Sequence, residues 1–287
     1  MRPTYASNEN LHKFISLALQ EDIGEGDHST LASVPENATG KARLLIKDDG
    51  ILAGVELAEM IFKVVDETLQ VEILIGDGSA VKKGDVGLYV SGKARSILQA
   101  ERLVLNCMQR MSGIATYTRF LQQKIAHTKA KLLDTRKTTP NFRICEKWAV
   151  WIGGGKNHRF GLYDMIMLKD NHIDYAGGIR KAIEATHKYL QEKNLSIRIE
   201  IETRNLQEVQ EVLEVGGIDV IMLDNMSLSD MKKAVQMIGD RFQTEASGGV
   251  NEQTIVSIAE CGVDFISVGA LTHSVKSLDI SLKAVKD

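Results

Sequence analysis

The stretch IRIEIETRNLQEVQEVLEVGGIDVIMLDN, residues 197–225, shows the fold of the chain most directly. Two short β-branched apolar runs, IRIEI and VIML, flank a segment with helical periodicity. This alternation is typical of a strand, a helix and a second strand that form one βα unit of a parallel sheet. Each run is followed by an acid, Glu202 or Asp224, where a purely structural strand would end on an apolar or turn-forming residue.

The same rhythm extends on both sides of this stretch. Strand centres are expected near Leu133, Ile166, Ile199, Ile221, Thr244 and Ile266. The last four are about 22 residues apart, which suits βα units with short loops. Six such units without a dinucleotide-binding glycine fingerprint favour a closed, reduced α/β barrel over an open doubly wound sheet. We therefore predict a barrel catalytic domain over residues 111–270.

A different pattern precedes the barrel and predicts a separate α/β domain over residues 1–110. Apolar residues recur every three or four positions over residues 8–21, as in an amphipathic helix. Short apolar runs separated by glycine-rich turns then predict strands and hairpins. These strands are expected over residues 42–55, 71–76 and 86–95.

Two further helices are expected at the edges of the barrel. A long helical stretch over residues 95–127 leads into it and is interrupted at Ser112-Gly113. A last helix over residues 271–286 is expected to return to the N-terminal domain.

Composition narrows the classes of function. The chain has 35 Lys and Arg against 38 Asp and Glu, a net charge of −3, whereas duplex nucleic acid and anionic membranes require a basic excess. The three cysteines lie far apart, so neither a disulfide framework nor a thiolate zinc site is indicated. The first residues form no apolar leader, and no apolar run approaches the roughly 18 residues of a spanning helix. We therefore expect a cytoplasmic protein with no nucleic-acid or membrane partner.

Polar residues or glycines follow every expected strand. Because the C-terminal ends of parallel strands meet at one mouth of a barrel, we expect these residues to form one site. They are Asp134, Arg136 and Lys137, then Lys169, Glu202, Asp224, Ser247 and Gly269.

The charge of one segment indicates the ligand. Between Asp134 and Lys169 there are seven Lys and Arg against three acids, so this segment is +4 in a chain that is −3. Arginine forks bind carboxylate and phosphate, so the ligand is expected to be small and polyanionic. Glu202 and Asp224 are hard oxygen ligands suited to Mg²⁺, and a diphosphate with its metal would use both sets of residues.

Glycines follow the last two strands. Ser247-Gly248-Gly249 and Gly269-Ala270 each stand between a strand and a helical pattern. Backbone N–H groups at such places bind phosphate monoesters, and the last strands of barrels commonly hold them.

Several blocks of the chain, in order, resemble the quinolinate phosphoribosyltransferase family. They are EDIGEGDHST (21–30), AERLVLNCMQRMSGIAT (100–116), DTRKTTP (134–140), GGGKNHRFGLYDMIMLKDNH (153–172), IEIE (199–202), IMLDN (221–225), EASGG (245–249) and ISVGALTHS (266–274). The resemblance covers nearly the whole chain. It implies an N-terminal α/β sandwich and a reduced α/β barrel, arranged as a homodimer with shared active sites, with a trimer of such dimers as a larger assembly. The segment 21–30 receives no role.

The resemblance also implies a pentosyltransferase of NAD biosynthesis. Such an enzyme transfers phosphoribosyl from 5-phosphoribosyl 1-pyrophosphate to quinolinate, with Mg²⁺ as its cofactor, and yields nicotinate mononucleotide, pyrophosphate and CO₂. The expected catalytic residues are Lys137, Lys169, Glu202 and Asp224, of which Glu202 and Asp224 would hold Mg²⁺ directly or through water. The residues expected at the quinolinate carboxylates and nearby phosphate are Arg102, lent by the partner subunit, Thr135, Arg136, Lys137, His158 and Arg159. Those expected at ribose and pyrophosphate are Lys169, Glu202 and Asp224. Those expected at the 5-phosphate are Ser247, Gly248, Gly249, Gly269 and Ala270.

Two other functions remain open at this point. A Schiff-base aldolase would use Lys169 as its nucleophile at a strand end. A non-catalytic barrel would bind polyanions without releasing pyrophosphate. The aldolase leaves the phosphate-binding turns and the two acids without a role, which favours phosphoribosyl transfer.

Overall fold

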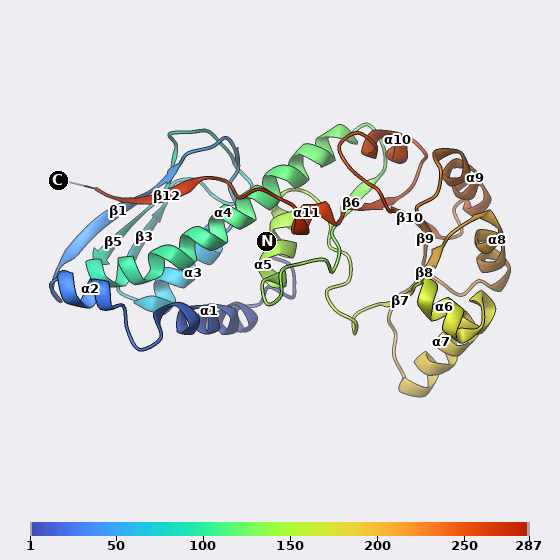
Figure 1. Ribbon diagram of the computed structural model, residues 1–287, viewed down its shortest axis with the longest axis horizontal. Coiled ribbons are helices and arrows are strands. Elements are labelled where there is room, and N and C mark those ends of the chain that lie inside the picture. Colours follow the sequence, from blue (N-terminus) through green and yellow to red (C-terminus); the bar gives the residue numbers. More distant parts are fainter. Residues whose placement is uncertain (1, 286–287) are drawn as a thin grey trace. The chain divides into compact units, whose positions relative to one another are not determined.

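The structure, a computed structural model, describes residues 2–285, and the chain forms two compact units (Figure 1). The first unit comprises the residues up to Arg119, Lys137–Gly154 and the segment from Leu271, and the second comprises Phe120–Arg136 and Gly155–Ala270. The chain therefore passes between the units four times. These boundaries differ from the expected division into residues 1–110 and 111–270, chiefly because residues 137–154 belong to the first unit.

The first unit contains an antiparallel sheet with the strand order β12-β1-β5-β3. Its strands are β1 (Thr39–Ile46), β3 (Gln70–Ile73), β5 (Val86–Lys93) and β12 (Ile280–Ala284), and the short strands β2 (Gly50–Ile51) and β4 (Ala80–Val81) pair with each other. Its helices are α1 (Asn8–Ile23), α2 (His28–Ser33), α3 (Val55–Val65) and α5 (Arg143–Ile152), together with most of α4 (Ala94–Lys124) and α11 (Ala270–His273). Helix α1 packs on α3.

The expected first helix is confirmed as α1, but the helix that follows the first strands was missed. A strand is expected to continue to residue 55. The last strand before α3, β2, instead ends at Ile51, and α3 begins at Val55. Asp77 caps α3, because its carboxylate accepts the N–H groups of Val55 and Glu56 at 2.9 and 3.1 Å. This cap comes from more than 20 residues along the chain, where no local helix signal reveals it.

Helix α4 runs without the interruption expected at Ser112-Gly113. The Ser112 hydroxyl binds the backbone of Ala53 instead, accepting its N–H at 2.9 Å and donating to its carbonyl at 3.2 Å. A Cβ at Gly113 would collide with the Lys276 carbonyl. The two residues are therefore contact points on a continuous helix.

The helix expected over residues 271–286 is wrong. Among the described residues of this segment, up to 285, only Ala270–His273 is helical, and Ile280–Ala284 forms strand β12 antiparallel to β1; residue 286 of the expected helix lies outside the described residues. Leu278, Ile280 and Leu282 are buried in alternation, which is the period of a strand.

The second unit contains six parallel strands in the order β6-β11-β10-β9-β8-β7, which confirms all six expected strands. They are β6 (Lys131–Leu133), β7 (Ile166–Leu168), β8 (Ile199–Thr203), β9 (Val220–Asp224), β10 (Gln243–Ser247) and β11 (Phe265–Ser267). Helices α6 (Asp170–Ala176), α7 (Ile179–Lys193), α8 (Leu206–Val215), α9 (Leu228–Ile238) and α10 (Ile255–Ala259) surround the strands (Figure 1).

The reduced barrel is not closed by a continuous hydrogen-bonded ladder within residues 2–285, in contrast to the expected closed sheet. Strands β6 and β7 are the two ends of the sheet order. Lys156 lies beside β6 instead, donating its N–H to the Leu132 carbonyl at 2.8 Å and accepting from Asp134 at 3.2 Å. The loop that carries Lys156 therefore occupies the edge of β6.

No helix within residues 2–285 combines the length and the apolar character that crossing a membrane requires.

Candidate active site

The acids and the serine at the strand ends share one face of the sheet. Ser247 is in register with Asp224, and Glu202 is in register with Met222, two residues before Asp224. Since neighbours in register and residues two apart point to the same side, Glu202, Asp224 and Ser247 face together. The opposite face carries buried apolar residues such as Ile201, against which the surrounding helices pack. The polar face is therefore the inner face of the barrel.

Glu202 lies in an environment of excess negative charge. Burial raises its pKa, the neighbouring charges of Asp224 and then Asp170 raise it further, and Lys169 opposes them. Asp224 itself accepts a hydrogen bond from Asn225 Nδ2 at 2.7 Å. Two carboxylates that repel each other at a half-buried strand end fit a divalent cation such as Mg²⁺, because a cation would relieve the repulsion with hard oxygen ligands.

The turn after β10 has a backbone that requires glycine. Gly248 and Gly249 have φ of 92° and 61°, and a Cβ at Gly248 would collide with the Asn225 side chain. The Asn225 N–H in turn donates to the Ser247 carbonyl at 2.9 Å. This turn does not lead directly into a helix as expected, since α10 begins only at Ile255.

The turn after β11 does lead directly into a helix. Gly269 immediately precedes α11, which begins at Ala270.

Two arginines gather near the end of β6. Burial lowers the pKa of Arg159, and the positive charge of Arg136 lowers it further, so the two guanidinium groups lie close enough to repel each other. Arg136 Nε is buried and has no hydrogen-bond partner. Like charges held together with an unpaired buried donor are an arrangement that an anion would stabilise.

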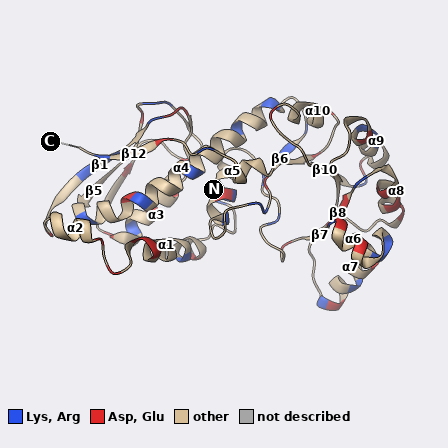
Figure 2. Cartoon of the chain, viewed as in Figure 1, with Lys and Arg blue, Asp and Glu red and all other residues tan. Residues whose placement is uncertain are grey.

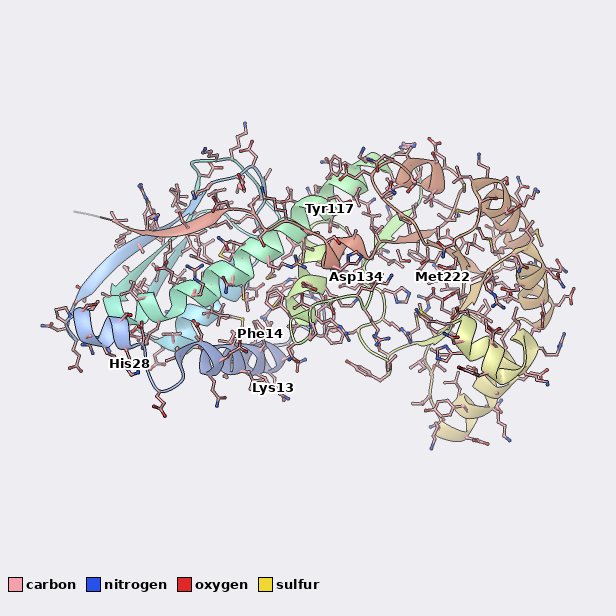
Figure 3. All side chains as sticks on the ribbon, in the orientation of Figure 1. Lys13, Phe14, His28, Tyr117, Asp134 and Met222 are labelled. Carbon is pink, nitrogen blue, oxygen red and sulfur yellow. The ribbon has the colours of Figure 1, made fainter. Side chains whose placement is uncertain are left out.

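Thr135 and Arg136 follow Asp134, which fixes this loop. The buried Asp134 carboxylate accepts the His158 N–H at 2.9 Å and Asn157 Nδ2 at 2.6 Å. It therefore joins the loop after β6 to the segment that carries His158 and Arg159; Figure 3 labels Asp134.

His158 is bound to two acids that the sequence analysis did not select. Its Nε2 lies 2.8 Å from Glu200 and 3.4 Å from Glu245, and both carboxylates are buried in the barrel. Figure 2 shows the acidic residues on β8. The strand period predicts this arrangement, because Glu200 lies two residues before Glu202 and Glu245 two before Ser247. One ligand atom from each of His158, Glu200 and Glu245 lies within 4.8 Å of the others, so the trio also has the composition of a metal site.

Two influences on the His158 ring disagree. Burial opposes its charge, but the two carboxylates outweigh it and raise the pKa of His158 to about 10. However, Nδ1 accepts the Arg159 N–H at 2.7 Å, which requires a lone pair on that nitrogen. Since a backbone N–H only donates, we assign the neutral ring with Nε2–H directed at Glu200. Burial and the charge of Glu245 raise the pKa of Glu200 to about 7, which favours a proton on this carboxyl more than on an ordinary glutamate.

Both nitrogens of His158 are thus engaged within the protein. Binding a quinolinate carboxylate through this ring, as the sequence predicts, requires one of these contacts to change.

Arg102 and Lys137 lie in the first unit, unlike the other predicted site residues. Arg102 is exposed on α4 and lines a cavity of about 690 Å³. Lys13 and Phe14 of α1 line the same cavity (Figure 3). Lys137 is exposed in the loop before α5.

The sequence matches two known domain families. It matches the C-terminal domain of quinolinate phosphoribosyl transferase over residues 114–283 and the N-terminal domain over residues 27–112. A rice protein named nicotinate-nucleotide pyrophosphorylase [carboxylating], chloroplastic, is 50% identical over 296 residues, covering 98% of this chain and 78% of that protein. A probable nicotinate-nucleotide pyrophosphorylase [carboxylating] of Synechocystis is 41% identical over 272 residues, covering 94% of this chain and 90% of that protein.

Solved structures agree with the sequence matches. NadC from Streptococcus pyogenes superposes with a TM-score of 0.91 at 37% identity, covering 99% of this chain and 100% of that one. The nicotinate-nucleotide pyrophosphorylase from Francisella tularensis gives a TM-score of 0.89 at 38% identity, with 98% of both chains covered.

Proposed function

We propose, from the premise that this chain belongs to the quinolinate phosphoribosyltransferase family, that it transfers the phosphoribosyl group of 5-phosphoribosyl 1-pyrophosphate to quinolinate. The products are nicotinate mononucleotide, pyrophosphate and CO₂, a step of de novo NAD biosynthesis. One observation carries the proposal: the second unit combines two arginines whose charges repel each other with two carboxylates whose charges repel each other.

The arginine pair suits the acceptor. Quinolinate has two adjacent carboxylates, and Arg136 and Arg159 offer two planar guanidinium forks for them. The unpartnered Nε of Arg136 gains an acceptor when the dianion binds. The same contacts orient the pyridine nitrogen toward the ribose, so that the two reactants meet in one geometry.

The acid pair and Lys169 suit the ribose and the leaving group. Loss of pyrophosphate from ribose C1 develops positive charge on the sugar, and the Glu202 and Asp224 carboxylates stabilise that charge. We assign Lys169, which lies near Glu202, to the negative charge that grows on pyrophosphate. We assign Mg²⁺ to Glu202 and Asp224, directly or through water, and when bound it neutralises pyrophosphate.

Decarboxylation follows from the bond that forms. When the pyridine nitrogen attacks C1, the ring becomes cationic. The bond from C2 to its carboxylate then breaks, CO₂ leaves, the electron pair passes to C2 of the ring, and C2 takes a proton from water. Because the cationic ring itself accepts these electrons, the residues need only hold the carboxylate and limit its solvation.

The glycine turns suit the 5-phosphate. Ser247 to Gly249 and the pair Gly269-Ala270 follow neighbouring strands, β10 and β11. We assign their backbone N–H groups to the phosphate monoester.

We extend the proposal to a homodimer with shared sites. Arg102 is exposed on α4 of the first unit and lines a cavity there with a second cation, Lys13, and with two acids, Glu21 and Asp22. We assign Arg102 itself, and not the cavity as a whole, to the anionic substrate. In a twofold dimer each subunit would lend this surface to the barrel of the other. A trimer of such dimers is the larger assembly that we assign.

We assign the protein to the cytoplasm. The three cysteines are free and buried, which suits a reducing compartment. Two plant relatives have other locations in their names: the rice protein is chloroplastic and a Nicotiana glauca protein is mitochondrial. Microscopy of the tagged protein in its own cells tests this assignment.

Release of CO₂ and pyrophosphate tests the reaction. The purified protein is incubated with quinolinate and 5-phosphoribosyl 1-pyrophosphate, with Mg²⁺ or with a chelator. We expect equimolar release of the two products that depends on both substrates and on Mg²⁺. Binding of both substrates without release would instead identify a non-catalytic barrel.

A Schiff-base aldolase has less support. A nucleophilic lysine needs surroundings that favour its neutral amine, whereas Lys169 lies near the carboxylate of Glu202. Borohydride with a keto acid is therefore expected to leave Lys169 unmodified in a mass spectrum of the digested protein.

A further inference from the structure

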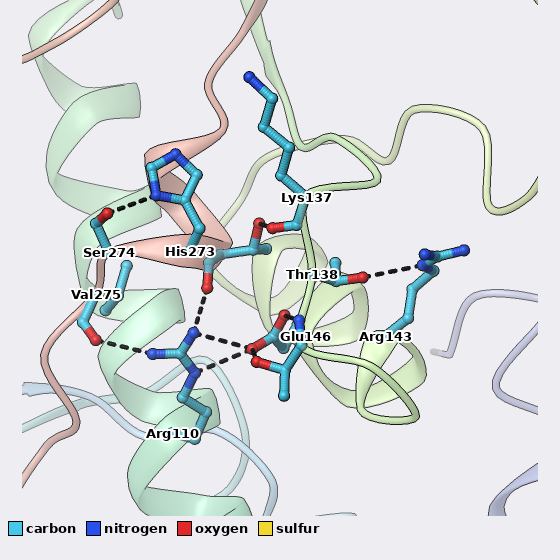
Figure 4. Close-up of polar contacts among 10 residues, drawn as sticks. Arg110, Lys137, Thr138, Arg143, Glu146, His273, Ser274 and Val275 are labelled. Atoms are coloured by element: carbon cyan, nitrogen blue, oxygen red, sulfur yellow. Dashed lines mark hydrogen bonds and ion pairs between the residues drawn. The ribbon is translucent and has the colours of Figure 1, made fainter.

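The loop that carries Lys137 is held at two points by side chains of the first unit (Figure 4). The Lys137 carbonyl accepts a hydrogen bond from the buried Thr272 hydroxyl at 2.8 Å. Two residues later, the N–H and the hydroxyl of Thr139 both donate to the Glu146 carboxylate at 3.0 Å. The intervening Thr138 hydroxyl accepts from Arg143 Nε at 2.9 Å. The loop therefore has a fixed backbone although it has no regular secondary structure.

Arg110 on α4 joins the two points. Its Nε and Nη2 donate to the same Glu146 oxygen at 3.0 and 2.9 Å. Its Nη1 donates to the Val275 carbonyl at 2.8 Å, and Nη2 also donates to the Thr272 carbonyl. One guanidinium group thus anchors both the residue that holds the Lys137 carbonyl and the carboxylate that holds the loop.

Stability alone is a weak reason for this arrangement. Glu146 is buried, and removing two charges from water costs enough that apolar residues of similar size often stabilise a protein as well or better. The ion pair instead fixes geometry, because each nitrogen of the Arg110 guanidinium group and each oxygen of the Glu146 carboxylate has a defined partner. Figure 4 shows the Lys137 side chain extending away from these contacts, so the contacts drawn there fix its backbone.

We propose that Arg110 and Glu146 are positioning residues for Lys137, which they hold through Thr272 and Thr139 in the geometry that phosphoribosyl transfer requires. This inference rests on the proposed function and on the role of Lys137 in it. In this proposal Arg110 and Glu146 act on the loop and not on the substrate, since they bond to Thr139, Thr272 and Val275 and to each other. Their effect on turnover must therefore pass through Lys137.

A double-mutant cycle tests the proposal. Arg110→Lys keeps the positive charge but loses the fork that reaches Glu146 and two carbonyls together. We expect it to lower kcat roughly 10- to 100-fold, as displacement of a catalytic group by about 1 Å does. In the Lys137→Ala background the same substitution should lower kcat less than twofold, because the group that it displaces is gone. An equal loss in both backgrounds, or no loss in the otherwise native enzyme, would overturn the proposal.

A milder variant and a matched control accompany the cycle. Thr272→Val removes only the hydroxyl that holds the Lys137 carbonyl, and it serves as the test if Arg110→Lys does not fold. It should show the same dependence on Lys137. Thr186→Val is the control, since it removes a hydroxyl that donates to a helix carbonyl at 2.8 Å on α7. We expect its kcat to be unchanged, with melting curves establishing that all variants are folded.

The activity of the native enzyme distinguishes failure of the proposed function from failure of the positioning role. If it releases no pyrophosphate, the proposed function fails and this inference fails with it. If it turns over normally and the losses in the cycle are equal, only the positioning role is overturned.

Discussion

Removing the C2 carboxylate from the acceptor should nearly abolish the reaction. Nicotinate has one carboxylate where quinolinate has two, so one fork of the Arg136 and Arg159 pair loses its partner. Each hydrogen bond to a charged group contributes about 2 kcal/mol, and a fork makes two, which gives a loss of about 4 kcal/mol. At about 1.4 kcal/mol per factor of ten, kcat/KM should fall roughly 10³-fold.

The assay compares kcat/KM for the two acids from pyrophosphate release at saturating 5-phosphoribosyl 1-pyrophosphate. Arg136→Lys should reduce the discrimination at least tenfold, because an ammonium group cannot bind a carboxylate at two points. Arg198→Lys is the matched control, since Arg198 is exposed just before β8, at the opposite end of that strand from Glu202, and should leave the ratio unchanged. Turnover of nicotinate within tenfold of quinolinate would refute the assignment of the arginine pair to two carboxylates.

Three further outcomes are expected. Glu202→Gln and Asp224→Asn should each lower kcat at least 100-fold, while the quinolinate affinity measured by calorimetry changes less than threefold, since these acids act on ribose and metal. A loss of quinolinate affinity with an unchanged kcat would exchange their roles with those of the arginines. Arg102→Ala and Lys137→Ala homodimers should each be nearly inactive. When the two variants are unfolded and reassembled together, half of the dimers are mixed and each has one intact site, so about a quarter of the sites should be active. Mixed dimers without activity would contradict a shared site. Because the folded protein raises the pKa of Glu200 to about 7, this carboxyl binds more protons in the folded protein than in the unfolded chain between pH 4.5 and 7, so the stability that it contributes should fall as pH rises through this range. The difference in free energy of unfolding between the native protein and Glu200→Gln, from denaturant titrations, should therefore fall with pH, and a difference that does not change with pH would show that this carboxyl does not titrate there.

The strands of the barrel were predictable because their signal is local. Each buried strand is a short β-branched run, and the acids at the C-terminal ends of β8 and β9, Glu202 and Asp224, mark the inner face. Helix α3 was not predictable in the same way, since Asp77 caps it from a distant turn. The contacts of Arg110 were not predictable for the same reason, because its partners are more than 30 residues away along the chain.

The inner acids were missed for a different reason. The predicted residues Glu202 and Ser247 lie at the C-terminal ends of β8 and β10, whereas Glu200 and Glu245 lie two residues earlier in the same strands. A charged residue inside a buried strand is itself a signal, because burial without a partner is unfavourable and a partner must be present. His158 is that partner here, and nothing in its sequence neighbourhood indicates that both of its nitrogens are engaged.

The pairing of β12 with β1 affects how the protein is made. Strand β1 is synthesised more than 200 residues before β12, with the whole barrel in between. One edge of the N-terminal sheet therefore remains unpaired throughout most of translation, and an open edge is a template for another chain. The nascent protein is most exposed to aggregation while the ribosome completes the barrel, and a truncation before Ile280 would make that exposure permanent.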